Sequence, residues 1–330
     1  MQETKEQSRA GKSQSGNNRA AENLPTAENL PSAENPEEKI PMKKSPANKK
    51  PAVLLFAGLL LLLLLTLGAC SRGTSSTWGG FSDPEEARLI REAMRYVFHA
   101  AGRLEGVDDA GNLRDFDGSN SLEGLAQCAE CGRRPAAVEL DFNFTADGKL
   151  ACIHDWYTEY ADGIEDGVPL TLGDFLAVRI YRNFTPAWIG DAADWLRSNP
   201  GTYIVTDIKD DNIAGCRAVA EACPDLLNRF VVQIYDESEY DAVREMGFEY
   251  VVYTLYRLDW NAKTDWRALG KFAASHPLIG FTFSWELCSV EGFVDGMLRS
   301  GVPLYVHTVN EGEEAYFDMG IAGVYTDIVR

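Results

Sequence analysis

Residues 136–142 of this chain read Ala-Ala-Val-Glu-Leu-Asp-Phe, and residues 202–209 read Thr-Tyr-Ile-Val-Thr-Asp-Ile-Lys. Both stretches are mainly apolar and carry their charged residues toward their carboxyl ends. A short, continuous apolar run is typical of a strand in a parallel sheet that is covered on both faces. Side chains two residues apart on a strand point to the same face, so we expect Glu139 and Asp141 to lie together.

Similar short runs recur after residue 95, with helical patterns between many of them. The predicted strands are 95–99, 136–142, 150–154, 202–208, 230–235, 249–254, 278–283 and 302–307, with a further short run at 321–326. The predicted helices are 120–130, 171–180, 188–198, 213–222, 237–246, 264–275, 289–300 and 311–319. About eight strands alternating with helices over about 250 residues predict an α/β fold, a (β/α)8 TIM barrel. The barrel should be irregular around its second and third strands, because too few residues separate Asp141 from Leu150 for a crossover helix.

The amino-terminal part of the chain has a different composition. Residues 1–50 are polar and contain the repeat Ala-Glu-Asn-Leu-Pro, which predicts a disordered tail. The uncharged, Leu-rich run 52–69 follows a cluster of lysines and leads into Cys70. Its length suits either a short transmembrane anchor or the apolar part of a signal peptide. Leu67-Gly-Ala-Cys70 is similar to a bacterial lipobox, in which the cysteine is acylated.

The alternatives are therefore an uncleaved anchor and a lipoprotein. The first would tie the protein to the cell membrane through residues 52–70, and the second through an acylated Cys70. The lysines that precede residue 52 favour the cytoplasmic side of the membrane. We therefore expect residues 71–330 to lie on the outer side. The predicted organisation is a disordered tail at 1–50, an anchor or lipoprotein signal at 51–70, a linker at 71–80 and the folded barrel domain at 81–330.

The charge of the chain narrows the range of partners. There are 50 acidic and 31 basic residues, a formal net charge of −19, and residues 1–50 contribute +2 of it. The rest of the chain therefore carries −21. A body this acidic repels phosphate backbones, which argues against a nucleic-acid partner. An anionic small substrate would need a metal ion or locally placed cations.

Polar side chains unsuited to a buried strand stand at the carboxyl ends of several predicted strands, where a barrel carries its active site. They include two histidines, three carboxylates and one lysine: His99, Glu139, Asp141, His154, Asp207 and Lys209. Three clustered carboxylates repel one another unless a cation lies between them. An oxygen-rich site of this kind suits Ca²⁺ or Mg²⁺ rather than Zn²⁺.

These residues belong to a series of short motifs that covers roughly residues 95–330. In chain order the motifs are His99-Ala100-Ala101-Gly102, Asn120-Ser121-Leu122-Glu123, Glu139-Leu140-Asp141, Asp147-Gly148, His154-Asp155, Asp207-Ile208-Lys209, Thr308-Val309-Asn310 and Gly323-Val324-Tyr325-Thr326-Asp327. The series resembles the glycerophosphodiester phosphodiesterase family of the PLC-like phosphodiesterase superfamily. The block from Glu139 to Asp155 is its most specific part.

The resemblance implies a barrel that hydrolyses glycerophosphodiesters to glycerol 3-phosphate and an alcohol with the help of a divalent metal. It further implies a role for each matched residue. Glu139, Asp141 and Asp207 would hold the metal; His99 and His154 would be the acid/base pair; Lys209 would contact the phosphate.

Two positions depart from the family pattern. Ala100 stands where the family usually has an arginine, and the sequence does not show whether Arg103 replaces it. Asp207 stands where the third metal ligand of the family is usually a glutamate. The Asp-x-Lys version found here is more similar to that of the sphingomyelinase D-type phospholipases. The alternatives are therefore a phospholipase acting on lipid headgroups and a barrel that binds a ligand without turnover. Asn120 is left with two roles, a helix N-cap, which we favour, or a residue that supports a metal ligand.

Overall fold

The computed structural model describes residues 80–329, which contain the predicted folded domain. The predicted tail at 1–50, the predicted anchor or signal at 51–70 and nearly all of the linker at 71–80 lie outside the described residues. Within residues 80–329, no helix is both long enough and apolar enough to cross a membrane.

Eight parallel strands close into a barrel, in which β1 pairs with β11 on one side and with β4 on the other. Around the barrel the strands are β1 (Tyr96–Phe98), β4 (Ala136–Phe144), β6 (Thr202–Ile208), β7 (Phe230–Ile234), β8 (Tyr250–Thr254), β9 (Gly280–Ser284), β10 (Leu304–His307) and β11 (Gly323–Thr326). The predicted TIM barrel is confirmed.

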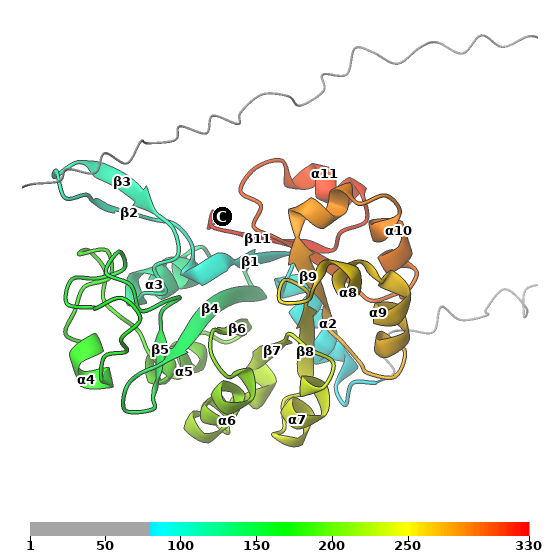
Figure 1. Ribbon diagram of the computed structural model, residues 1–330, viewed down its shortest axis with the longest axis horizontal. Coiled ribbons are helices and arrows are strands. Elements are labelled where there is room, and N and C mark those ends of the chain that lie inside the picture. The colour runs from blue at the N-terminus through cyan, green and yellow to red at the C-terminus, as the bar shows by residue number, and fades with distance from the viewer. Residues whose placement is uncertain (1–79, 330) are drawn as a thin grey trace, which may run out of the picture. The chain divides into compact units, whose positions relative to one another are not determined.

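Helices surround the strands (Figure 1). They are α2 (Pro84–Ala93), α3 (Leu122–Glu130), α4 (Leu172–Phe175), α5 (Ile189–Ser198), α6 (Asn212–Ala222), α7 (Glu239–Glu245), α8 (Trp260–Thr264), α9 (Trp266–Ala273), α10 (Phe293–Leu298) and α11 (Glu313–Asp318). Each of the eight predicted helical regions contains a helix, although the one expected over 171–180 ends at Phe175.

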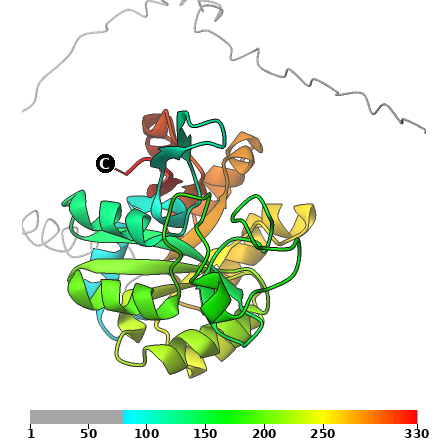
Figure 2. The ribbon, with the colours of Figure 1, turned by 90° about the vertical axis from the view of Figure 1, so that its left-hand side faces the viewer.

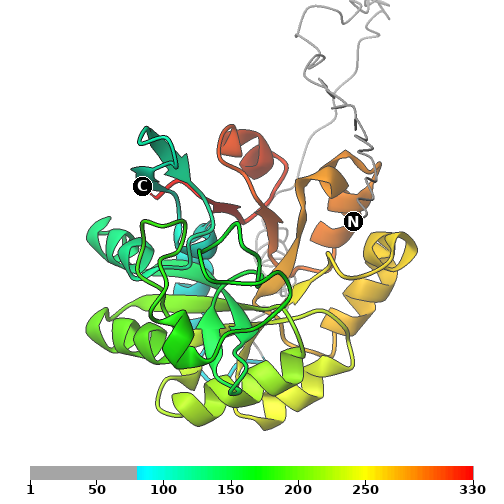
Figure 3. The ribbon, with the colours of Figure 1, turned by 60° about the vertical axis from the view of Figure 1, so that its left-hand side comes forward.

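The irregularity expected between the second and third predicted strands is present. The chain turns back after β4, and β5 (Leu150–Cys152) runs antiparallel to it, with Cys152 opposite Phe142. The predicted strand 150–154 is therefore no part of the barrel, and the short run at 321–326 supplies the eighth barrel strand as β11. Residues 145–188, which we call the side segment, contain β5 and α4 and lie on one side of the barrel (Figures 2 and 3).

A small antiparallel hairpin, β2 (Leu104–Val107) with β3 (Leu113–Phe116), was not expected from the sequence. It projects from the barrel after β1 (Figure 1). Only Gly106 and Phe116 are buried among its strand residues, so the sequence shows no apolar run there.

The inward-facing side chains divide the barrel interior into an apolar end and a polar end. The apolar end is filled by residues such as Val97, Val231 and Val252, and α2 closes it with Ile90 and Met94. Helix α2 begins after Asp83, whose side chain accepts hydrogen bonds from the backbone N–H groups of the first turn. Toward the carboxyl ends of the same strands the inward positions become polar, which places the candidate site at that end.

Candidate active site

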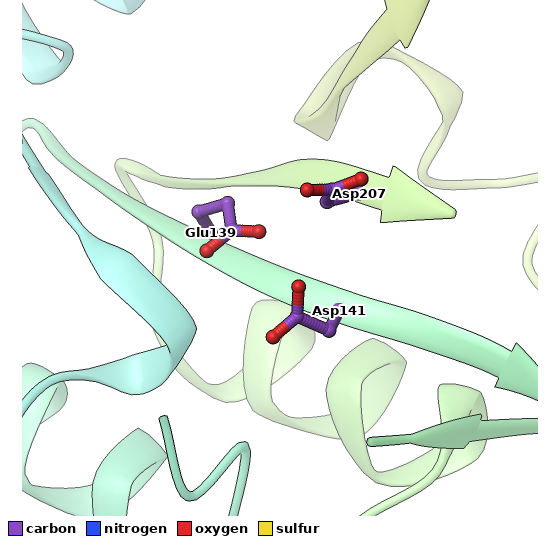
Figure 4. Close-up of side chains that lie close together, drawn as sticks. All are labelled: Glu139, Asp141 and Asp207. Carbon is purple, nitrogen blue, oxygen red and sulfur yellow. The ribbon is translucent and has the colours of Figure 1, made fainter. Parts of the chain in front are cut away.

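The three predicted metal-binding carboxylates lie together on two neighbouring strands. Asp141 of β4 is directly opposite Asp207 of β6 in the parallel register, and Glu139 precedes Asp141 by two residues. All three side chains are buried, and their candidate ligand oxygens lie within 4.8 Å of one another (Figure 4). An all-carboxylate donor set of this kind fits a hard divalent cation such as Ca²⁺ or Mg²⁺.

Glu139 and Asp141 are each held by a specific donor. The backbone N–H of Ala100 donates to Glu139 Oε2 at 2.8 Å. The side-chain amide of Asn120 donates to Asp141 Oδ2 at 2.8 Å, and its carbonyl oxygen accepts the N–H of Asp141 at 3.0 Å. The N-cap of α3 is Ser121. Of the two roles considered for Asn120, the favoured one was therefore wrong, and this residue supports Asp141.

Lys209 is the cation that contacts the carboxylates. Its Nζ lies 2.7 Å from Asp141 Oδ1 and 2.9 Å from Asp207 Oδ2, and its side chain is 14% exposed. Burial by itself would lower the pKa of Lys209, but Asp141 and Asp207 raise it well above its ordinary value. Lys209 is therefore charged at neutral pH, at the edge of the carboxylate cluster.

The carboxylates differ in how readily they ionise. Burial, reinforced by the negative charge of Asp141, raises the pKa of Glu139 well above its usual range. Burial also acts to raise the pKa of Asp207, but Lys209 and two tyrosine hydroxyls outweigh it, so this pKa is lowered. The cluster thus holds more negative charge than Lys209 alone offsets, and a divalent cation would favour ionised Glu139.

His99 follows β1 and is fixed by residues that follow two other barrel strands. Its Nδ1 lies 2.7 Å from Asp327 Oδ1, and Asn310 donates to Asp327 Oδ2 at 2.7 Å. Burial disfavours the charged imidazole, but the hydrogen bond to Asp327 and the charge of Glu139 raise the pKa of His99 to about 9. The orienting role of Asp327 was missed, although its place directly after the last strand was a usable signal.

His154 lies in a different environment from the one its predicted strand end implied. It follows β5, outside the barrel, and its Nδ1 lies 2.5 Å from Asp155 Oδ2. The side chain is 44% exposed, and its ring is stacked near Tyr160 at 6.4 Å between centroids. The chain continues from β5 beside the end of β4, where the side-chain amide of Asn143 donates to the backbone oxygen of His154 at 3.3 Å.

A cavity of about 40 Å³ opens at the polar end of the barrel. Its lining residues are His99, Glu139, Asp207, Gln233, Thr254, Tyr256, Thr282, His307 and Tyr325. Thus it includes His99 and two of the carboxylates, while His154 is not among its lining residues. Burial and the nearby charge of His99 lower the pKa of His307 to about 4, so this imidazole is neutral at pH 7.

The arginine missing after His99 is not replaced by Arg103. The Arg103 guanidinium binds Asp117, with Nε 2.6 Å from Oδ1 and Nη2 3.0 Å from Oδ2. Position 100 contributes its backbone N–H to Glu139 instead of a side-chain cation. Fixed positive charge beside the carboxylates therefore comes from Lys209 and from protonated His99.

No protein-family model and no curated protein matches this sequence. Among solved structures, a Silicibacter pomeroyi protein assigned as a glycerophosphoryl diester phosphodiesterase matches with a TM-score of 0.58 and 18% identity, over 75% of this chain and 94% of its own. An Oleispira antarctica phosphodiesterase in complex with the product sn-glycerol-3-phosphate matches with a TM-score of 0.56 and 13% identity, over 72% and 95%. A Parabacteroides distasonis glycerophosphoryl diester phosphodiesterase matches with a TM-score of 0.53 and 16% identity, over 75% and 89%. The chain is thus similar in fold to these phosphodiesterases, as the motif resemblance implied.

Proposed function

We propose that the protein is a metal-dependent glycerophosphodiester phosphodiesterase, which releases glycerol 3-phosphate and an alcohol. The observation that carries this proposal is the buried cluster of Glu139, Asp141 and Asp207 with Lys209 at the mouth of the barrel. The similarity in fold to solved phosphodiesterases, one of them bound to sn-glycerol-3-phosphate, supports it.

Each part of the proposed site has a task that its chemistry suits. The three carboxylates would hold Ca²⁺ or Mg²⁺, whose contribution when bound is to neutralise and orient an anionic diester. Lys209 would bind the phosphate and stabilise the charge that builds up in the transition state. His99, fixed by Asp327, and His154, fixed by Asp155, would be the acid/base pair: one takes a proton from the nucleophile and the other gives one to the leaving alkoxide.

The experiment is release of glycerol 3-phosphate from a panel of glycerophosphodiesters, using the full chain before and after treatment with EDTA. Chelation should abolish release, and added Ca²⁺ or Mg²⁺ should restore it, because the carboxylates need a cation. Glu139→Gln should be inactive with either ion, whereas Glu291→Gln, on the exposed surface, is the matched control and should be unaffected. Full activity of the EDTA-treated protein would contradict the metal requirement.

A second candidate function is favoured by one observation, the shorter ligand Asp207 next to Lys209. A sphingomyelinase D-like enzyme would release the headgroup alcohol from an intact lipid. Hydrolysis of lysophospholipid or sphingomyelin vesicles without action on the soluble panel would support this alternative. Binding of either substrate class without turnover would indicate a ligand-binding barrel.

We also propose that the protein is tethered to the cell membrane with its barrel on the outer side. The support is the sequence of residues 52–70, preceded by lysines. Protease added to intact spheroplasts should digest the barrel domain, and protection of the domain alongside a digested surface control would contradict the orientation. Labelling with a palmitate analogue that is lost in Cys70→Ala would identify a lipoprotein rather than an anchor.

A further inference from the structure

Asp207 differs from the other two carboxylates in the number of donors that it accepts from. The hydroxyl groups of Tyr235 and Tyr256 both donate to Oδ1, the latter at 2.9 Å, while Lys209 donates to Oδ2 at 2.9 Å. Tyr235 directly follows β7, and Tyr256 follows β8 after one intervening residue, so three consecutive barrel strands converge on one carboxylate.

The two hydroxyls determine which oxygen of Asp207 is available for a cation. A carboxylate oxygen has two acceptor positions, and both positions on Oδ1 are taken. Oδ2 therefore has the remaining capacity, on the side where Lys209 and Asp141 lie. Rotation about the last torsion of an aspartate is broad and roughly two-fold, so the residue itself does not choose between its oxygens. The choice is made by its partners.

Arg257 holds the two tyrosines in place. Its guanidinium carbon lies 3.6 Å from the centroid of the Tyr235 ring and 5.6 Å from that of Tyr256. Nη2 of the same side chain donates to the backbone oxygen of Ile208 at 2.6 Å. Since Ile208 lies between Asp207 and Lys209, one arginine connects the end of β6 to both tyrosine rings.

We propose that Tyr235 and Tyr256, supported by Arg257, are positioning residues that hold Asp207 with Oδ2 directed toward Lys209 and the bound divalent cation. The inference rests on the part of the proposed function that assigns a cation to the three carboxylates. It adds residues that do not themselves bind the cation or the substrate phosphate. It also gives a physical reason why the shorter aspartate can serve as the third ligand, since its free rotation is removed.

The test measures Ca²⁺ and Mg²⁺ affinity of the full chain by isothermal titration calorimetry, in the absence of any substrate. Tyr235→Phe and Tyr256→Phe keep the rings, and so the contacts with Arg257, but remove the hydroxyls. The double variant should bind the preferred ion at least about tenfold more weakly, the usual scale for groups that orient metal ligands. In each single variant, the logarithm of the metal association constant should fall by less than half as much as in the double variant. The reason is that the other hydroxyl still occupies Oδ1.

Tyr240→Phe is the matched control. Tyr240 is also buried, and its hydroxyl donates to the backbone oxygen of Pro277 at 3.1 Å, without contact to the carboxylates. This variant should keep wild-type metal affinity. In the metal-free state it should lose about as much thermal stability as Tyr235→Phe or Tyr256→Phe. If the double variant fails to fold, the single variants decide: weaker metal binding in either one than in Tyr240→Phe supports the proposal, and wild-type affinity in both would overturn it.

Wild-type metal affinity in the double variant would overturn the proposal, and so would a wild-type protein that binds neither ion. An equal loss in Tyr240→Phe would also overturn it, by making the effect a general consequence of destabilisation. A wild-type protein that binds Ca²⁺ or Mg²⁺ but cleaves no glycerophosphodiester would contradict the proposed function alone, because the affinity measurement involves no turnover.

Discussion

The two proposed acid/base histidines are supported by different parts of the molecule. His99 follows a barrel strand; its partner Asp327, and Asn310, which in turn holds Asp327, follow the two strands next around the barrel. His154 belongs to the side segment, residues 145–188, and its partner is its own chain neighbour Asp155. Asp327 is 8% exposed, whereas Asp155 is 37% exposed.

The difference shows two ways of fixing a side chain. In the barrel, backbone pairing sets the height of each strand end, so residues distant in sequence arrive at defined positions. The side segment has its own small apolar cluster, in which Phe116 of the hairpin packs with Trp156, Phe175 and Phe184. His154 is held by the packing of its loop beside this cluster and by one local hydrogen bond, to Asp155. We therefore expect the barrel histidine to depend strongly on its partner and the side-segment histidine to depend less on its own.

The largest effect should come from removing either imidazole. His99→Ala and His154→Ala should each lower kcat by at least about 10²-fold, the usual scale for a general acid or base. The double variant should be little worse than either single one, because each loss already interrupts the same proton-transfer cycle. The measurement is steady-state kinetics on the best diester of the panel, with circular dichroism to confirm folding.

His276→Ala is the control for this comparison. The His276 ring is stacked on Phe272 at 4.1 Å, and its Nδ1 bonds to the Phe272 backbone oxygen, so it is a structural residue. It should keep wild-type kcat, with some loss of thermal stability. If His99→Ala and His154→Ala keep most of the activity, the two histidines are not the acid/base pair. The comparison of how they are held would then say nothing about catalysis.

The same contrast explains what could be read from the sequence. The strand 202–208 was predicted to the residue, and the other barrel strands to within two residues at each end, because a buried parallel strand is a continuous apolar run. The carboxylate cluster followed from strand ends and the two-residue spacing of Glu139 and Asp141. The place of Asp327 after the last strand was a usable signal, but its contact with His99 and those of the two tyrosines with Asp207 were missed, because nothing local reveals which strand end lies beside which. The direction of β5 was also missed, since an apolar run predicts burial but not orientation.

The next effect in size should come from Asp327→Asn. The amide cannot supply the negative charge that raises the pKa of His99, so this pKa should fall below about 9 in the metal-free protein. Activity should fall at least about tenfold, because the imidazole loses its charged orienting partner. NMR titration of the histidine ring signals and steady-state kinetics are the two measurements, with Asp295→Asn on the exposed surface of α10 as the control.

Asp327→Asn should also change how stability depends on pH. The folded-state pKa of His99 lies above its unfolded value, so its stabilising effect is complete below about pH 6.5 and is lost as the pH rises through about 9. In EDTA, the melting temperature of the wild-type protein should therefore fall more between these pH values than that of Asp327→Asn. Parallel curves for the two proteins would mean that Asp327 does not stabilise the charged imidazole.

The smallest effect should come from Asp155→Asn, which makes the same change at the side-segment histidine. The His154–Asp155 pair is partly open to solvent on both sides, and solvent screens such a pair strongly. Packing against Tyr160 and the neighbouring apolar cluster remains, so the imidazole should keep most of its orientation. We expect a loss in kcat of less than about tenfold, clearly below that of Asp327→Asn. A loss equal to that of Asp327→Asn would show that His154 is held as strictly as His99.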